Sequence, residues 1–96
     1  MAAYLIAEVT VTNPQGYEAY KPLAAAAIAK HGGRYLVRGG NAEVQEGQPW
    51  SRIVVLEFPS MEQARRFYNS PEYQAALPLR KANAASRVTL VEGVPG

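Results

Sequence analysis

The sequence predicts an α+β fold in which four strands and two main helices follow the order β-α-β-β-α-β. Strands are expected at 3–11, 34–38, 51–58 and 87–93, because these segments are rich in β-branched and aromatic residues. Segments with helical spacing of apolar residues separate the first strand from the second and the third from the fourth. Glycine, proline and capping residues lie at the boundaries between these segments.

The composition predicts one globular domain over residues 1–96. The chain is 48% hydrophobic and contains no cysteine and one histidine, His31. We therefore expect no disulfide, no cysteine nucleophile, no metal site and no bound cofactor. The net charge of +2 is small and the basic residues are scattered, so nucleic acid is not an expected partner. The first strand lacks the basic start of a signal peptide and no segment is long enough to cross a membrane, so we expect a soluble cytoplasmic protein without membrane contact.

The first half of the chain carries clear helix boundaries. Asn13 and Pro14 predict the start of a helix that runs to about Lys30. Pro22 lies inside it and is expected to kink or split the helix near Glu18. Gly32 follows at the position where a left-handed cap is needed, so a positive φ is predicted there.

The second half repeats the pattern with a longer connection. Residues 41–51 predict a polar connection that could include a short edge hairpin. Ser60 begins a second helix, with Gln63 completing a capping box, and Ser70 begins a short further helix perturbed by Pro78. The whole order is that of the split βαβ, or ferredoxin-like, arrangement. It predicts an antiparallel sheet of order 4-1-3-2 with both main helices on one face.

Alternation along the strands assigns residues to the two faces of this sheet. The face under the helices is predicted to hold Leu5, Ala7, Val9, Val11, Tyr35, Val37, Val54, Leu56, Phe58, Val88 and Leu90. The open face is predicted to hold Tyr4, Ile6, Glu8, Thr10, Arg34, Leu36, Arg38, Ile53, Val55, Glu57, Arg87, Thr89 and Val91.

The open face is unusually apolar for a solvated surface. Five aliphatic side chains are predicted to share it: Ile6, Leu36, Ile53, Val55 and Val91. Monomers seldom expose so large an apolar patch, so we expect a homodimer formed through this face. RNA binding is disfavoured, because the central strands lack exposed aromatic residues for base stacking.

Three segments together resemble a known family. They are HGGRYLVRGG at 31–40, VVLEFPSMEQARRFYNSPEY at 54–73 and SRVTLVEG at 86–93. They are similar to a mostly bacterial family known only as domain of unknown function number thirteen-thirty. The resemblance implies a dimeric α/β barrel, in which two ferredoxin-like sheets face each other, and brings no established activity. The residues that it marks are Tyr17, Tyr20, Arg38, Gly39, Gly40, Glu57, Ser70, Tyr73 and Arg80.

Glu57 is the candidate catalytic acid or base. It follows an apolar run, so burial would raise its pKa unless Arg34 or Arg38 pairs with it. The sequence leaves that choice open. Glu8 is expected near Arg38 and Arg87, and His31 near the end of the face that holds Glu57. No sequence pattern of a serine or cysteine nucleophile is present.

A ligand site is predicted between the open face of the sheet and the helical segments. Its candidate residues are Arg38, Glu57, Tyr17, Tyr20, Ser70, Tyr73 and Arg80. Ser70 is most simply interpreted as a helix cap, and the pattern favours core or interface roles for the tyrosines over catalytic ones. The expected ligand is a small, partly apolar acid or carbonyl compound, bound or transformed without a cofactor. The alternative is a non-catalytic dimeric ligand-binding or stress-related module.

Overall fold

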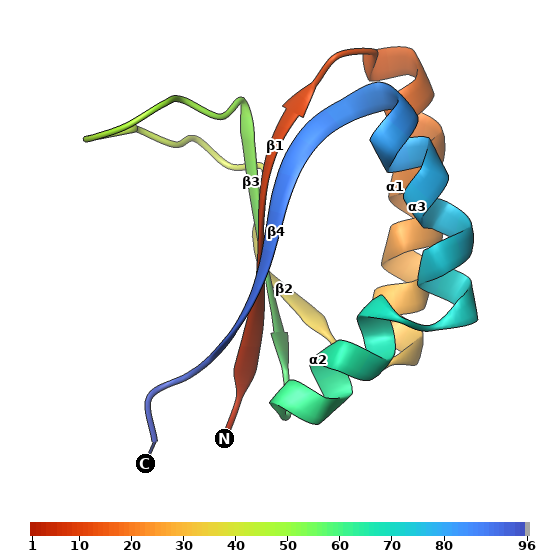
Figure 1. The fold of residues 1–96 in the computed structure, drawn as a ribbon, viewed down its shortest axis with the longest axis vertical. Coiled ribbons are helices and arrows are strands. Elements are labelled where there is room, and N and C mark those ends of the chain that lie inside the picture. Colours follow the sequence, from red (N-terminus) through yellow and green to blue (C-terminus); the bar gives the residue numbers. More distant parts are fainter. Residues whose placement is uncertain (96) are drawn as a thin grey trace.

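A four-stranded antiparallel sheet covered on one face by helices makes up the computed structural model, which describes residues 1–95 (Figure 1). The strands are β1 (Ala3–Val11), β2 (Arg34–Arg38), β3 (Arg52–Phe58) and β4 (Ala84–Glu92), and the helices are α1 (Pro14–Lys30), α2 (Met61–Tyr68) and α3 (Pro71–Asn83). The sheet order is β2-β3-β1-β4. This confirms the predicted ferredoxin-like topology. None of the helices over residues 1–95 has the length and apolar character needed to span a membrane.

The core lies between the sheet and the helices. Alternate residues of β1 and β3 point into it, among them Val9 and Phe58, and both side chains are almost completely buried. Phe67 of α2 packs against Phe58 with 5.1 Å between the ring centres. The alternation predicted for the two central strands is therefore confirmed. All three helices lie on the same side of the sheet in Figure 1, and the other side carries no helix.

The helix ends follow from their local sequence. The side chains of Asn13, Ser60 and Ser70 each accept a hydrogen bond from a backbone N–H of the first turn that follows. At the end of α1, Gly32 has a φ of 76°. Its N–H and that of Gly33 donate to the carbonyls of Ala29 and Ile28, at 3.3 and 2.9 Å. This is a Schellman cap, and it confirms the positive φ predicted at Gly32.

Both internal prolines are tolerated better than predicted. Pro22 does not split α1, which continues to Lys30, and α3 runs for 13 residues through Pro78. Both prolines lie on exposed helix surface. Water can therefore reach the carbonyls that lose their internal partner, while the opposite side of each helix packs on the core.

Two expectations around the connections are also corrected. Residues 39–51 form an irregular loop without the edge hairpin. Gln63 does not complete a capping box, because its side-chain amide donates to the carbonyl of His31 at 2.8 Å instead. Gln63 thus ties the start of α2 to the end of α1.

A bulge in β2 changes which residues face the helices. Tyr35 lies opposite Leu56 of β3, but Val37 lies opposite Val55 and Arg38 opposite Val54. Leu36 is the extra residue between these pairs, and such an insertion reverses the alternation that follows it. Val37 therefore lies on the open face and Arg38 on the helix-covered face, the reverse of the arrangement predicted by strict alternation.

Candidate ligand-binding cavity

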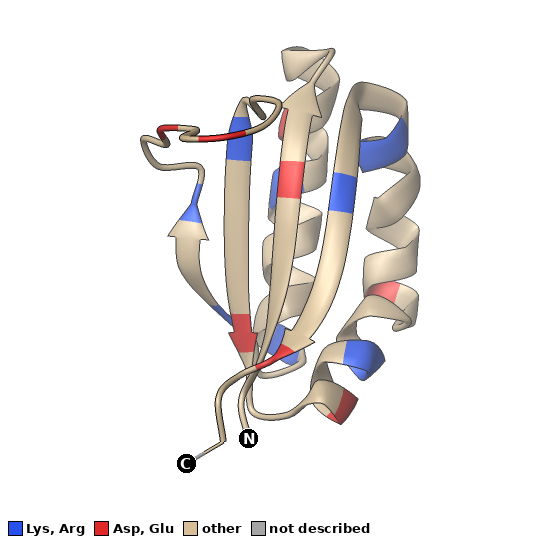
Figure 2. Ribbon diagram, turned by 60° about the vertical axis from the view of Figure 1, so that its left-hand side comes forward, with Lys and Arg blue, Asp and Glu red and all other residues tan. Residues whose placement is uncertain are grey.

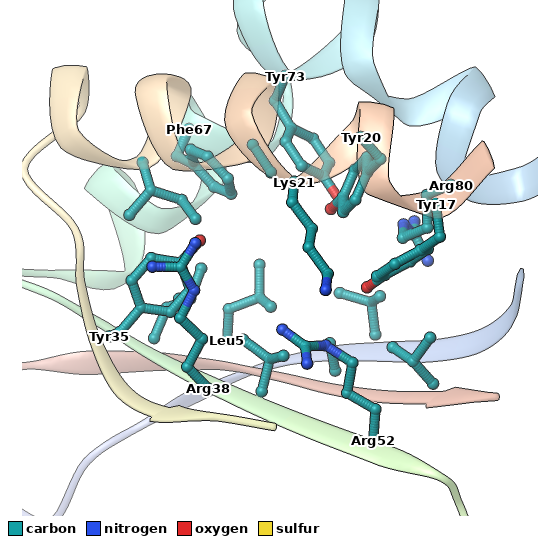
Figure 3. A pocket seen from close by; sticks show the side chains of 17 residues that line it. Leu5, Tyr17, Tyr20, Lys21, Tyr35, Arg38, Arg52, Phe67, Tyr73 and Arg80 are labelled. Carbon is teal, nitrogen blue, oxygen red and sulfur yellow. The ribbon is translucent and has the colours of Figure 1, made fainter. Parts of the chain in front are cut away.

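A cavity of about 40 Å³ lies between the sheet and the helices (Figure 3). The sheet contributes Leu5, Ala7, Val9, Tyr35, Arg38, Arg52, Val54, Leu56 and Val88, and the helices contribute Tyr17, Tyr20, Lys21, Ala24, Ile28, Phe67, Tyr73 and Arg80. The cavity is on the helix-covered face. The cavity therefore does not lie at the open face, where the ligand site was predicted, because the helices cover the other side of the sheet.

The charged lining of this cavity has a single sign. Lys21, Arg38, Arg52 and Arg80 contribute to it, and no acidic side chain of residues 1–95 does. In Figure 3, Lys21 from α1 and Arg52 from β3 point toward one another across the space. Like charges directed at one space repel each other unless an anion lies between them. The lining therefore favours a negatively charged occupant.

Arg80 is the most deeply buried of these cations. It belongs to the inward side of α3 together with Tyr73 and Leu77, and it is only 4% exposed. One terminal nitrogen donates to the hydroxyl of Ser86, whereas its Nε has no hydrogen-bond partner among residues 1–95. The Nε of Arg52 is likewise buried and without a partner in the described chain. A buried N–H group without an acceptor is energetically costly, so both Nε atoms are available to donate to a ligand.

Lys21, Arg38 and Arg52 each have a neighbouring group that partly stabilises their charge. The ammonium group of Lys21 lies 2.9 Å from the carboxylate of Glu18. The guanidinium of Arg38 lies 4.4 Å from the centre of the Tyr35 ring, which is within the range of a cation–π interaction. Arg52 lies 6.0 Å from the ring centre of Tyr17. Aromatic faces therefore hold the guanidinium groups of Arg38 and Arg52 near the cavity without neutralising them.

Buried tyrosine hydroxyls complete the polar lining. The hydroxyl oxygens of Tyr20 and Tyr73 are 2.7 Å apart. Burial raises the pKa of Tyr20 far above its usual value, and the adjacent Tyr73 raises it further. Burial also raises the pKa of Tyr35, against the opposing effect of Arg38 and Arg52. These two phenols therefore remain protonated at neutral pH, when they can donate hydrogen bonds to an oxygen atom.

Most of the predicted ligand-binding residues do come together. Tyr17, Tyr20, Arg38, Tyr73 and Arg80 all line the cavity. Ser70 does not: its hydroxyl donates to the carbonyl of Phe67 at 2.7 Å and accepts from the N–H of Tyr73 at 3.2 Å. Ser70 therefore caps α3, the second of the two interpretations of this residue.

Glu57 also lies away from the cavity, on the open face of the sheet. Its carboxylate accepts a hydrogen bond from Arg34 Nε at 2.6 Å, and the hydroxyl of Tyr4 lies 3.4 Å from its other oxygen. The alternative that sequence left open is thus resolved in favour of a pair with Arg34. His31 does not join this group, because its ring lies 2.9 Å from Glu72 at the start of α3.

Three polar lining residues were not predicted as site residues: Lys21, Tyr35 and Arg52. Arg52 had a usable signal, because it shares the alternation of Val54, Leu56 and Phe58 and lies opposite Val9 of β1. An arginine at an inward position of an apolar strand indicates a buried charge that needs a partner. Lys21 had no comparable signal, since its position follows only from the packing of α1.

The open face forms a second distinct surface. Arg87 contacts both carboxylate oxygens of Glu8, at 2.9 and 3.1 Å, and Arg34 pairs with Glu57. Arg38 takes no part here, contrary to the prediction that it lies near Glu8. Figure 2 shows charged positions near both ends of β3, and an acidic and a basic position part-way along the neighbouring strands β1 and β4. The aliphatic side chains of this face, which we call the open-face patch, are Ile6, Leu36, Val37, Ile53, Val55 and Val91.

Comparison with known proteins supports the fold and gives a family. The model of the family described as "Domain of unknown function (DUF1330)" matches residues 2–94. No curated protein is similar enough to the chain to count as a relative.

Solved structures share the fold at low sequence identity. A protein of unknown function from Rhodopseudomonas palustris is 18% identical and superposes with a TM-score of 0.79, over 99% of this chain and 84% of its own. SnoaB, a cofactor-independent oxygenase from Streptomyces nogalater, is 16% identical with a TM-score of 0.68, over 99% and 95%. A dimeric protein of unknown function with a ferredoxin-like fold from Bacteroides fragilis is 13% identical with a TM-score of 0.59, over 96% of each chain.

Proposed function

The chain belongs to the DUF1330 family, and we propose that its cavity binds the carboxylate group of a small, partly apolar acid. The observation that carries this proposal is a pair of buried arginine nitrogen atoms without an acceptor in the described chain. Arg52 and Arg80 each have a buried Nε with no acceptor among residues 1–95. A carboxylate would supply acceptors for both, and arginine is the side chain best suited to bind one through paired hydrogen bonds.

The size of the cavity supports a head group of few atoms. A cavity needs roughly 10–15 Å³ of free volume to hold one water molecule. The 40 Å³ of the cavity therefore has room for the few heavy atoms of a carboxylate or a small carbonyl group. The aliphatic walls from Leu5, Val54 and Leu56 suit the first carbons attached to that group.

Binding can be tested by titrating the protein with acetate and with acetamide, its neutral counterpart, using calorimetry. We expect acetate to bind and acetamide to bind much more weakly. Arg52→Gln should raise the Kd for acetate by about tenfold to a hundredfold, the usual worth of a hydrogen bond to a charged group. Arg65→Gln, which changes an exposed arginine of α2, is the control and should leave the Kd unchanged. Equal binding of acetate and acetamide would contradict the proposal.

A second candidate function is cofactor-free chemistry on a carbonyl compound bound in the same cavity. The adjacent hydroxyls of Tyr20 and Tyr73, together with Arg80, could polarise a carbonyl oxygen and stabilise an enolate. The similarity in fold to a cofactor-independent oxygenase is compatible with such chemistry. The described lining contains neither a carboxylate nor an imidazole, so it offers acids and cations rather than an obvious general base.

Exchange of carbon-bound hydrogen separates this chemistry from simple binding. Pyruvate in deuterated buffer should lose its methyl proton signal in NMR spectra faster with the protein than without it, and Tyr73→Phe should slow this exchange. Binding of pyruvate without accelerated exchange would instead favour the non-catalytic ligand-binding or stress-related module.

We further propose that the functional unit is a homodimer formed through the open-face patch. Three of its side chains, Leu36, Val37 and Val91, are 39–47% exposed in the single chain. The pairs Glu8–Arg87 and Arg34–Glu57 flank this apolar area and would form a polar rim. A dimeric protein with a similar fold supports this assembly.

A further inference from the structure

The small cavity adjoins a larger surface cleft. This outer cleft, of about 220 Å³, lies between the start of α1 and the start of β3. Tyr17, Lys21 and Arg52 line both spaces, so these three side chains form the boundary between them. The outer cleft also contains the apolar side chains of Val11 and Pro14. A ligand whose head group fills the cavity can therefore extend into a partly apolar cleft past Arg52.

The boundary at Arg52 is a more accessible entrance than the other side of the cavity. A second cleft adjoins the cavity at Arg80 and Val88. There Arg80 is only 4% exposed and its guanidinium group donates a hydrogen bond to Ser86, so movement of this side chain would disrupt a packed region. Lys21 and Arg52, by contrast, are half-buried, and their side chains have long flexible stems.

Gly39 leaves the space that Arg52 occupies at this boundary. A Cβ atom added to Gly39 would overlap the terminal nitrogen of Arg52 and lie 2.8 Å from its Cζ. The backbone at Gly39 also has a φ of 70°, which a residue with a side chain rarely adopts. Any larger residue at this position would push the guanidinium group away from the cavity.

We propose that the outer cleft holds the apolar chain of the acid whose carboxylate enters the cavity, and that Gly39 is a positioning residue for Arg52. This inference rests on the proposed function and adds the class of ligand. Val11 and Pro14 make part of the outer cleft apolar, and Glu18 already occupies Lys21 in an ion pair, so a second carboxylate would lose hydration there without gaining a free cation from α1. The ligand is therefore a monocarboxylic acid with a short apolar chain, and not a diacid.

A series of unbranched acids tests the use of the outer cleft. Calorimetric Kd values for acetate, butyrate and hexanoate should fall with chain length, by roughly fourfold for each methylene group that is buried. Succinate, a diacid of the same chain length as butyrate, should bind more weakly than butyrate. If hexanoate binds no more tightly than acetate while Arg52→Gln still weakens acetate binding, the outer cleft is not used and the proposed function stands. If none of the monocarboxylic acids binds, both fail.

Two glycine variants test the positioning role. Gly39 and Gly47 both have positive φ values, but an added Cβ at Gly47 would meet no atom within 4 Å. Gly39→Ala and Gly47→Ala should therefore lower the melting temperature by similar amounts. Only Gly39→Ala should raise the Kd for acetate, by about tenfold or more, because it alone displaces Arg52. Unchanged acetate binding in a folded Gly39→Ala variant would overturn the positioning role.

Discussion

A guanidinium group that is buried without a counter-ion raises the free energy of the folded chain, and Arg80 is such a group. Its hydroxyl partner Ser86 removes none of the charge, and its Nε has no acceptor in the described chain. Proteins generally pair buried charges, so an unpaired one indicates a site whose ligand contributes the missing charge. Under the proposed function, Arg80 therefore lowers the stability of the chain when no ligand is bound.

Replacing Arg80 should weaken acetate binding without lowering the free energy of unfolding. Arg80→Met keeps most of the side-chain volume and removes the charge. We expect the free energy of unfolding to stay within about 1 kcal/mol of the original or to rise, because an apolar replacement for a buried charge is often neutral or stabilising. Acetate binding should fall at least about tenfold. Urea unfolding and calorimetry measure the two effects, and a large loss of stability with unchanged binding would show that Arg80 is purely structural.

Gly32 gives a prediction about backbone conformation. Its φ of 76° completes the cap of α1, and an added Cβ would meet nothing closer than 3.9 Å. Gly32→Val should therefore cost on the order of 1–2 kcal/mol of stability through backbone strain rather than through a clash. Gly40→Val is the control, because that glycine lacks a positive φ and has open space around it. Equal midpoints of urea unfolding for the two variants would contradict this account.

Features determined by neighbouring residues were predictable from the sequence, whereas several site residues were not. Asn13, Ser70 and Gly32 act within one turn of chain, so their roles as caps follow from local pattern. Arg38 faces the cavity only because of the bulge at Leu36, and the bulge depends on pairing with a strand that follows a 13-residue loop. No local pattern in RYLVR indicates it.

At the scale of elements, one ionic cluster joins the end of α1 to the start of α3. The carboxylate of Glu72 lies 2.9 Å from both the His31 ring nitrogen and the Lys30 ammonium group. The hydrogen bonds from His31 and then from Lys30 lower the pKa of Glu72 to about 2, from an ordinary value of 4.5. This cluster links two helices that line the ligand cavity.

The lowered pKa of Glu72 predicts how stability depends on acid. The pKa of Glu72 is lower in the folded chain than in the unfolded chain, so deprotonation of this carboxyl stabilises the fold. Its contribution to the free energy of unfolding is complete above pH 4.5 and is lost as the pH falls toward 2. Glu72→Gln should therefore reduce the decline in melting temperature across this pH range. His31→Gln should have a similar effect, since it removes the larger cause of the shift. Parallel curves for all three proteins would contradict the assignment.

Element boundaries were less predictable than element types. The third helix extends to 13 residues and β4 begins at Ala84 rather than at residue 87, although the sequence patterns indicated both elements. In each case tertiary packing outweighs local preference. The exposed Pro78 can be accommodated because Ala76, Leu77 and Arg80 pack inward on the same helix. The cavity follows from the same packing, so its position on the helix-covered face could not be derived from strand alternation alone.

At the scale of the whole molecule, topology and the nature of the two sheet faces were predictable, because both depend on residue order and alternation. The open-face patch has the make-up of a surface that a second chain would cover. Its apolar side chains share the open face with two ion pairs, Arg34–Glu57 and Glu8–Arg87. A second copy of this chain would present the same apolar area and the same rim, as a two-fold symmetric interface requires.

A matched pair of leucines tests this assembly. Leu36 in the open-face patch and Leu23 on the outer surface of α1 are both 47% exposed in the single chain. Leu36→Asp should convert the dimer to a monomer, because dimerisation would then bury an unpaired carboxylate at a cost of several kcal/mol. Leu23→Asp introduces the same charge at equal exposure away from the patch and should remain dimeric. Light scattering at micromolar concentration measures both masses. A monomeric unaltered protein, or two variants of equal mass, would exclude the open face as the interface.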